Sequence, residues 1–135
     1  IPSVVGDERI RQRYVLCVLY WSTTSTTATS TGTDTTTTED TSLWVVDWSA
    51  HECDWDGISC NEKRVAVVTL SESNLVGTIP NELSALSSLQ ALSLFGNRLS
   101  GSIPSSLWSM PLLVWCDLSN NELKGGIVMP SSSAT

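Results

Sequence analysis

The second half of the chain, from Val65 onward, repeats itself with a fixed offset of 24 residues. Six positions match in three successive copies: Val68, Leu92 and Cys116; Leu70, Leu94 and Leu118; Ser73, Asn97 and Asn121; Leu75, Leu99 and Leu123; Gly77, Gly101 and Gly125; and Ile79, Ile103 and Ile127. A period of this length with an L-x-L-x-x-N-x-L core predicts a solenoid, in which each turn adds one short strand to a parallel sheet. The asparagine is expected to cap the backbone of the turn that follows. We therefore expect an α/β solenoid of about two and a half repeats over residues 65–128, with its parallel β-sheet on the concave face.

The segment before the repeats contains a helical pattern over residues 7–21. One face of this helix would carry an apolar stripe made of Ile10, Tyr14, Cys17, Val18 and Trp21,. Asp7 is placed to cap the first turn. The opposite face is apolar too, through Val15, Leu16, Leu19 and Tyr20. We therefore expect one helix that is packed on more than one side.

A low-complexity insert separates the helix from the rest of the chain. Residues 22–42 hold 12 Thr and 4 Ser in 21 positions, and no apolar residue is larger than Ala28. Such a segment cannot bury enough apolar surface to offset the entropy of ordering it. Two interpretations stay open: a solvated linker, or a mucin-like acceptor of O-linked sugars. In the second case the candidate acceptors are Thr26, Thr27, Thr35, Thr36, Thr37 and Thr38.

The repeats resemble the leucine-rich repeat family, and specifically its plant-type subclass. The residues that carry the resemblance are the G-x-I-P motifs at 77–80 and 101–104, the C-D-W-D-G-I-S-C segment at 53–60, and Trp44 and Trp48 upstream of it. The resemblance implies that residues 1–64 form an N-terminal cap and that Cys53 and Cys60 form a disulfide in a hairpin at 53–60. Residues 129–135 are a tail outside it. The family implies a non-catalytic module that recognises protein or glycan ligands.

The cysteines bear on the compartment and on metal binding. A zinc site would need two further ligands near Cys53 and Cys60, and the chain offers only His51 and two distant cysteines,. Cys116 takes an inward leucine position and Cys17 lies on the helix stripe, so both are expected to be small buried hydrophobic residues. A paired cysteine staple points to an oxidising, extracellular or cell-surface location.

Charge and motif content exclude several classes of function. Fourteen Asp and Glu against seven Lys and Arg leave a net charge of −7, which disfavours nucleic acid as a partner,. The longest apolar run, at 14–21, is far shorter than the roughly 20 residues of a membrane span. No phosphate-binding, nucleophile-elbow or zinc-protease motif occurs. We expect no enzyme activity, no cofactor and no metal, although the acidic residues around Asp54 leave a weak calcium site conceivable.

Binding is therefore expected on the concave sheet, where residues alternate with the inward leucines. The candidates are Phe95, Trp115, Asp117, Ser93 and Thr69. Two of them are large aromatic residues, which interaction hot spots favour. The alternative is that the helix or the N-terminal cap covers them.

The last turn poses a separate problem, because a solenoid exposes its apolar core at an uncapped end. Leu118, Leu123 and Ile127 belong to that turn, and no segment after it resembles a cap. Either further repeats follow, or another molecule covers the end. Two functions follow from this: an extracellular recognition module, or a structural O-glycosylated protein whose short solenoid assembles head to tail with copies of itself into a filament or surface layer.

Overall fold

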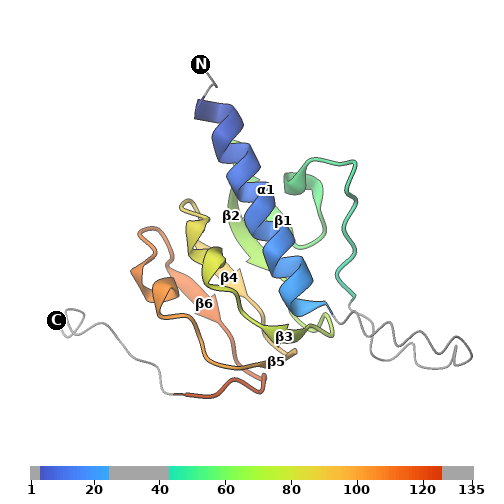
Figure 1. The fold of residues 1–135 in the computed structure, drawn as a ribbon, viewed down its shortest axis with the longest axis vertical. Coiled ribbons are helices and arrows are strands. Elements are labelled where there is room, and N and C mark those ends of the chain that lie inside the picture. Colours follow the sequence, from blue (N-terminus) through green and yellow to red (C-terminus); the bar gives the residue numbers. More distant parts are fainter. Residues whose placement is uncertain (1–3, 25–42, 126–135) are drawn as a thin grey trace, which may run out of the picture.

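The repeats lie side by side, so that residues 24 positions apart become neighbours in one sheet (Figure 1). The computed structural model describes residues 4–24 and 43–125. The elements in chain order are α1 (Val4–Thr23), η2 (Glu52–Asp54), β1 (Ile58–Asn61), β2 (Arg64–Thr69), β3 (Val76–Thr78), η3 (Asn81–Ala85), β4 (Ala91–Ser93), β5 (Arg98–Ser100), η4 (Ser105–Ser109) and β6 (Trp115–Asp117).

The main sheet has the strand order β1-β2-β4-β6. Each repeat contributes one parallel strand, and the register pairs Val68 with Leu92 and Leu92 with Cys116. Strand β1 pairs with β2 in the antiparallel direction and so closes the sheet at its N-terminal side. A second, two-stranded parallel sheet joins β3 to β5. These features confirm the solenoid fold that the sequence predicted.

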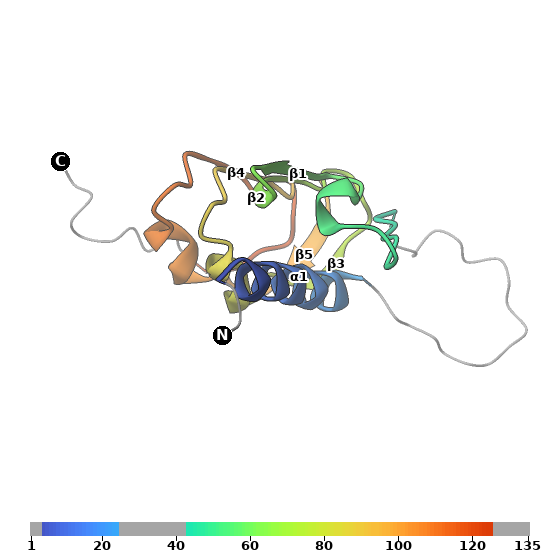
Figure 2. The ribbon, with the colours of Figure 1, turned by 90° about the horizontal axis from the view of Figure 1, so that it is seen from above.

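The core lies between the main sheet and the helices. Figure 2 shows α1 on the same side of the main sheet as β3 and β5. The repeats fill this space with fully buried side chains, among them Val68, Leu70, Leu75, Leu83, Leu89, Leu92, Leu94, Leu99 and Leu107. Helix α1 contacts η3, β3 and β2, so it covers the first repeat and closes the solenoid at that end.

Asn97 ties the second turn of the solenoid back to the first, so it caps the preceding turn and not the turn that follows, contrary to our expectation. Its Oδ1 accepts hydrogen bonds from the backbone N–H groups of Ser73, at 2.9 Å, and Leu75, at 3.1 Å. Its Nδ2 donates to the carbonyl of Leu70 at 2.8 Å. Asn121 forms the same kind of bonds between the second and third turns. An amide serves here because it offers an acceptor and two donors at once.

Helix α1 is longer than the predicted 7–21. It begins at Val4, so Asp7 lies inside the helix and does not cap it, contrary to our expectation. It ends at Thr23, which is fully buried and whose hydroxyl donates to the Leu19 carbonyl at 2.6 Å. The first residues of the predicted 22–42 insert are therefore helical. Residues 25–42, with all six candidate glycosylation threonines, lie outside the described residues.

Helix α1 packs on the repeats through only one of its two apolar faces, so the expected packing on more than one side was wrong. The buried apolar side chains of this helix are Val15, Leu16 and Leu19. On the other face, the exposed fractions are 70% for Ile10, 60% for Tyr14 and 62% for Trp21, whereas Cys17 is partly buried against the core. The prediction was wrong because residues 14–21 are apolar without interruption, so periodicity could not separate the two faces,.

Gly77, in β3, allows the C-terminal end of α1 to approach the first repeat. Its φ of +117° is a conformation that side-chain-bearing residues rarely adopt,. A Cβ atom at this position would also overlap the carbonyl oxygen of Ser22. The glycine of the first G-x-I-P motif thus serves the packing of the cap as well as the turn.

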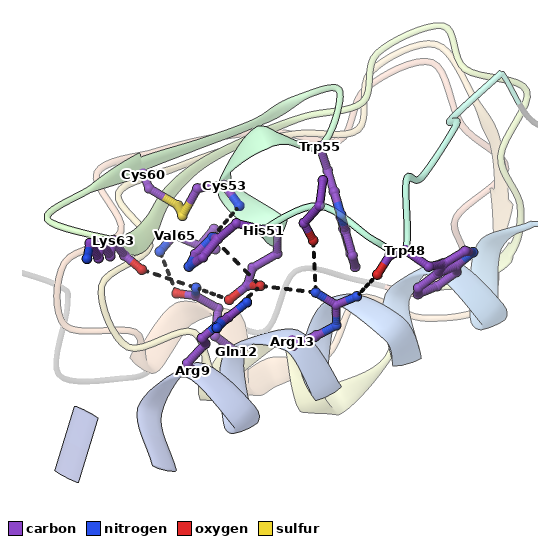
Figure 3. A network of polar contacts seen from close by, with 12 residues as sticks. Arg9, Gln12, Arg13, Trp48, His51, Cys53, Trp55, Cys60, Lys63 and Val65 are labelled. Carbon is purple, nitrogen blue, oxygen red and sulfur yellow. Dashed lines mark hydrogen bonds and ion pairs between the residues drawn. A yellow bond between two sulfur atoms is a disulfide. The ribbon is translucent and has the colours of Figure 1, made fainter. Parts of the chain in front are cut away.

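A buried carboxylate joins the cap to the solenoid (Figure 3). Glu52 is fully buried, and its Oε1 accepts a hydrogen bond from Gln12 Nε2 at 2.9 Å. The Gln12 oxygen accepts in turn from the Val65 backbone N–H at 2.6 Å. Glu52 Oε2 makes no hydrogen bond but lies 3.5 Å from Arg13 Nη1 and 3.8 Å from Arg9 Nε. Helix, loop and first strand are therefore held by one polar network.

The disulfide between Cys53 and Cys60 is present, which confirms the pairing implied by the family resemblance. It links η2 to β1 and lies beside the Glu52 network in Figure 3. Cys17 and Cys116 are free thiols. Both are only partly buried, so neither is the fully buried small residue that we expected.

Candidate interaction surface

The outward face of the main sheet is built from two rows of side chains. The pairing of β2 with β4 and of β4 with β6 aligns Val67, Ala91 and Trp115 in one row and Thr69, Ser93 and Asp117 in the next. Successive side chains of a strand point to opposite faces. The buried partners Val68 and Leu92 therefore fix these two rows on the face turned away from the core.

Trp115 is the large anchor of this surface, and it is 52% exposed. Phe95 follows β4 and is half-buried, while Thr69 is exposed. Helix α1 lies on the other side of the sheet, with β3 and β5, so it does not cover these residues (Figure 2). The helix therefore does not fold over Phe95 and Trp115, which was one of the alternatives.

Ser93 is less accessible than the alternation of side chains predicts. It is 4% exposed, and its hydroxyl lies 2.7 Å from the hydroxyl of Ser71 on the neighbouring turn. The Ser71–Ser93 pair therefore stabilises the sheet surface. The alternation of side chains predicts on which face of the sheet Ser93 lies, but it does not predict that neighbouring side chains cover this residue.

Asp117 places a negative charge next to Trp115. Its carboxylate accepts hydrogen bonds from the Ser119 hydroxyl and from the Ser119 backbone N–H. These two bonds, chiefly the one from the Ser119 hydroxyl, hold the pKa of Asp117 below its ordinary value of 3.8. The group is thus ionised at any physiological pH. A flat aromatic side chain beside a fixed anion suits a partner with an apolar group next to a cationic one.

The C-terminal end of the solenoid is less well covered than the rest. Leu118 and Leu123 are only partly buried, whereas their equivalents Leu94 and Leu99 are fully buried. A hollow of about 450 Å³ lies there, lined by Trp108, Cys116, Leu118, Leu123 and neighbouring residues. Ile127, the third predicted member of this end, lies outside the described residues.

The two free thiols lack the features of catalytic cysteines. Burial, and then the charge of Asp117, raise the pKa of Cys116 to about 11. Burial also raises the pKa of Cys17. Since the thiolate is the reactive form, both groups are weak nucleophiles near neutral pH. Within residues 4–24 and 43–125, no cluster of His, Cys, Asp and Glu could hold a metal ion.

His51, the single histidine of the chain, has a structural role in the N-terminal cap. Its Nδ1 accepts a hydrogen bond from the Cys53 backbone N–H at 3.1 Å, which caps η2. It borders a hollow of about 560 Å³ whose lining includes Arg9, Lys63 and Arg64. In the part of the chain that the structure describes, no helix is both long and apolar enough to cross a membrane.

The comparisons with known proteins agree with this architecture. The Leucine Rich Repeat family model matches residues 88–110. The chain is 44% identical over 57 residues to the Leucine-rich repeat receptor protein kinase EMS1 of Arabidopsis thaliana, which is 42% of this chain and 5% of that protein. It is 42% identical over 56 residues to Protein MALE DISCOVERER 1 of the same plant, which is 42% of this chain and 8% of that protein.

Solved structures extend the likeness to most of the chain. The BIR2 ectodomain from Arabidopsis thaliana superposes with a TM-score of 0.64 and 34% identity, over 81% of this chain and 54% of that one. The Arabidopsis HAESA LRR ectodomain, solved with an extended IDA peptide hormone ligand, gives a TM-score of 0.65 and 28% identity, over 87% of this chain and 18% of that one. The chain thus spans about half of the BIR2 chain and a small part of the other proteins. Its repeats, its cysteine-paired cap and these likenesses show that it has the fold of a leucine-rich repeat solenoid, similar to that of the plant receptor ectodomains.

Proposed function

We propose that this chain is a non-catalytic, extracellular recognition module that binds a protein or peptide on the outward face of its main sheet. The observation that carries the proposal is Trp115, which is 52% exposed on an uncovered sheet and adjoins the ionised Asp117. Exposed tryptophan next to a fixed charge is the composition of an interaction hot spot. The paired cysteines support an oxidising compartment,.

The structural neighbours support a protein or peptide as the partner. The HAESA LRR ectodomain was solved with an IDA peptide hormone ligand, and another structural neighbour comes from the BIR3–SERK2 complex. A peptide could lie along the row that contains Thr69 and Asp117, with an apolar side chain on Trp115 and a cationic group at Asp117. A glycan would use the same hydroxyl-rich rows but would have no need of the negative charge.

The experiment is a selection of binders from a displayed library of random peptides. Binders are selected on the wild-type chain and then measured on Trp115→Ala, Asp117→Asn and the control Val45→Ala, whose side chain is exposed on the cap. We expect at least a tenfold loss of affinity for Trp115→Ala and a salt-dependent loss for Asp117→Asn. Selected peptides that bind all variants equally, or glycan-array hits with no peptide hits, contradict the proposal.

A second function, head-to-tail self-assembly, is supported by the partly exposed Leu118 and Leu123 at the open end. A contact between this end and another surface of the next copy would be heterologous, and such contacts form filaments when they do not close. The O-glycosylation of Thr26, Thr27 and Thr35 to Thr38 belongs to this proposal. Intact-mass measurement of the native protein tests it, since the bare polypeptide has a mass of 14.6 kDa.

A further inference from the structure

The hollow of about 560 Å³ beside His51 lies where the cap meets the repeats, and none of the proposed sheet-surface residues lines it. Its walls come from the start of α1, from the β1–β2 hairpin at 61–64, and from the chain just before β4 and β6. The disulfide and the side chain of Gln12, which donates to the Lys63 carbonyl at 3.2 Å, hold the hairpin against the rest of the cap. The hollow is therefore formed before any ligand binds, and its volume is within the roughly 300–1,000 Å³ that small-ligand sites occupy.

The hairpin brings unpaired positive charge to this hollow. Lys63 and Arg64 are exposed, and within the described residues neither side chain makes an ion pair. The lining contains two carboxylates, and one of them, Glu8, lies 3.8 Å from Arg11. Only Glu62 is left to oppose the two hairpin cations. The hairpin side of the hollow thus has one more cation than anion.

Arg9 adds a second excess charge from the helix side. Glu52 Oε2 lies 3.8 Å from Arg9 Nε and 3.5 Å from Arg13 Nη1, so one carboxylate serves two guanidinium groups. The contact uses only the Nε of Arg9, whose side chain is 56% exposed and lines the hollow. Figure 3 shows Arg9, His51 and Lys63 at the same end of this network, away from Trp48. Because the whole chain carries a net charge of −7, this end is a local reversal of charge, which favours an anionic ligand,.

Neutral groups in the lining restrict which anion fits. His51 Nδ1 accepts from the Cys53 backbone N–H, so the neutral ring carries its proton on Nε2,. Within the described residues this Nε2–H has no partner, and the cap holds the ring in place. Asn61 and Gln90 add side-chain amides, and Leu112, which is 48% exposed, adds an apolar wall. Fixed donors beside a small apolar wall suit a carboxylate on a short aliphatic stem.

We propose that this hollow binds an acidic side chain, Asp or Glu, of a protein or peptide partner. Arg64 and Lys63 pair with the carboxylate, Leu112 contacts its aliphatic stem, and the amides of the lining bond to the partner's backbone. A doubly charged phosphate is disfavoured, because it would meet the repulsion of Glu62 twice over. A sugar acid has the carboxylate but lacks the aliphatic stem. The proposal goes beyond the recognition function proposed above, since it uses none of the residues of the sheet surface.

NMR titration of the whole chain tests the proposal with two matched probes at constant ionic strength. The first is the α-amide of N-acetylglutamate, which carries one side-chain carboxylate, and the second is the neutral α-amide of N-acetylglutamine. We expect the acid to bind with a millimolar dissociation constant and to move the side-chain resonances of His51, Asn61 and Gln90. The neutral probe should bind at least about fivefold more weakly, because it gains nothing from the excess charge.

Variants at exposed positions locate the site without a risk to folding. Arg64→Gln and Lys63→Gln should each weaken binding of the acid about threefold, and Glu62→Gln should strengthen it by a similar factor. Lys124→Gln is the matched control, because it makes the same change in net charge at the other end of the solenoid and should leave the affinity unchanged. Trp115→Ala should bind the acid like the wild type, so a failure of this site is distinguishable from a failure of the sheet surface.

Four results would overturn the proposal. Absence of shifts at His51, Asn61 and Gln90 would show that the hollow is not a site. Equal binding of the acid and its neutral match would remove the role of charge. Equal weakening by Lys124→Gln and Arg64→Gln would reduce the effect to the net charge of the chain. Tighter binding of inorganic phosphate or galacturonate than of the N-acetylglutamate amide would assign the hollow to a different anion.

Discussion

The side-chain nitrogen of Gln12 lies 2.9 Å from the buried carboxylate of Glu52, although the two residues are 40 positions apart. This contact joins α1 to the loop that precedes β1, on the opposite side of the long threonine-rich insert. The same Gln12 side chain accepts from the Val65 backbone N–H at 2.6 Å. A single amide thus fixes where the helix sits on the first strand of the solenoid.

We expect Gln12→Leu to lower the free energy of unfolding by about 2–5 kcal/mol. The substitution nearly keeps the volume but leaves Glu52 Oε1 and the Val65 N–H without the hydrogen bonds that Gln12 makes to them. Arg11→Ala is the control, because its pair with Glu8 is exposed and should contribute less than about 1 kcal/mol,. Denaturant titration of both variants checks this, and equal losses would show that the network adds little stability.

The central repeat offers a second comparison of buried and exposed positions. Leu94→Ala should lower the free energy of unfolding by about 2–5 kcal/mol, because it opens a cavity where the side chain is now fully buried,. Thr69→Ala, on the exposed face of the same sheet, should change it by less than about 0.5 kcal/mol. Ser93→Ala should lie between them, since it removes the hydrogen bond to Ser71,. A different order would mean that the faces of the sheet are assigned wrongly.

The fold of the repeats could be predicted well because equivalent residues of successive repeats lie next to each other in the sheet. The 24-residue offset that aligns Val68, Leu92 and Cys116 in the sequence is the register of β2, β4 and β6. The same repeat predicted the fold class correctly. The Cys53–Cys60 pairing was correctly implied by the resemblance to the leucine-rich repeat family.

The cap could not be predicted in the same way, because it depends on one-of-a-kind contacts between distant segments. Helix α1 has two apolar faces, and only the packing of Leu16 and Leu19 on the repeats selects one. The polar Gln12 lies on the same buried face because Glu52, 40 residues away, accepts a hydrogen bond from it there. The prediction that Ser93 is exposed was wrong for a similar reason, because the accessibility of this residue depends on side chains from neighbouring turns.

The pKa of Asp117 gives a test of the sheet surface. Its folded value is depressed, so the carboxylate's contribution to stability is present above its unfolded value of about 3.9 and is lost as the pH falls through the folded value,. Ser119→Ala removes the hydroxyl donor, so the pKa of Asp117 should rise toward 3.8. Carbon-detected NMR titration of the carboxyl group measures this shift.

Asp47 and Ser49 provide the matched control for that titration. Ser49 donates to Asp47 through its hydroxyl and its backbone N–H, and these bonds also lower the pKa of Asp47. Ser49→Ala should therefore raise the pKa of Asp47 and leave Asp117 unchanged. A rise at both aspartates in either variant would point to a global change in structure and would contradict the local cause.

The disulfide predicts the response of the chain to reduction and alkylation. Cys53 and Cys60 should resist alkylation before reduction, and the Cys53→Ser, Cys60→Ser double variant should lose roughly 2–3 kcal/mol of stability. Cys116, with a pKa raised to about 11, should react slowly with iodoacetamide at pH 8 and faster after unfolding,. Peptide mass mapping decides both points. A bridge between Cys17 and Cys116 would contradict the assignment.

The open end of the solenoid gives the last prediction, through Leu123. This residue is partly buried in the third turn, whereas the equivalent Leu99 is fully buried in the second. Apolar surface left in water costs about 25 cal/mol per Å², so something that covers this end would stabilise the chain. If a copy of the chain covers it, Leu123→Glu should dissolve a head-to-tail assembly and leave the cap and first repeat folded.

If further repeats cover the end in a longer chain, the same substitution should instead lower the melting temperature of the monomer and leave its mass unchanged. Light scattering and thermal melting of the Leu123→Glu variant distinguish these two cases. If Leu123→Glu changes neither the mass nor the melting temperature, no partner buries Leu123, and the third repeat does not have the register that places Leu123 with Leu75 and Leu99.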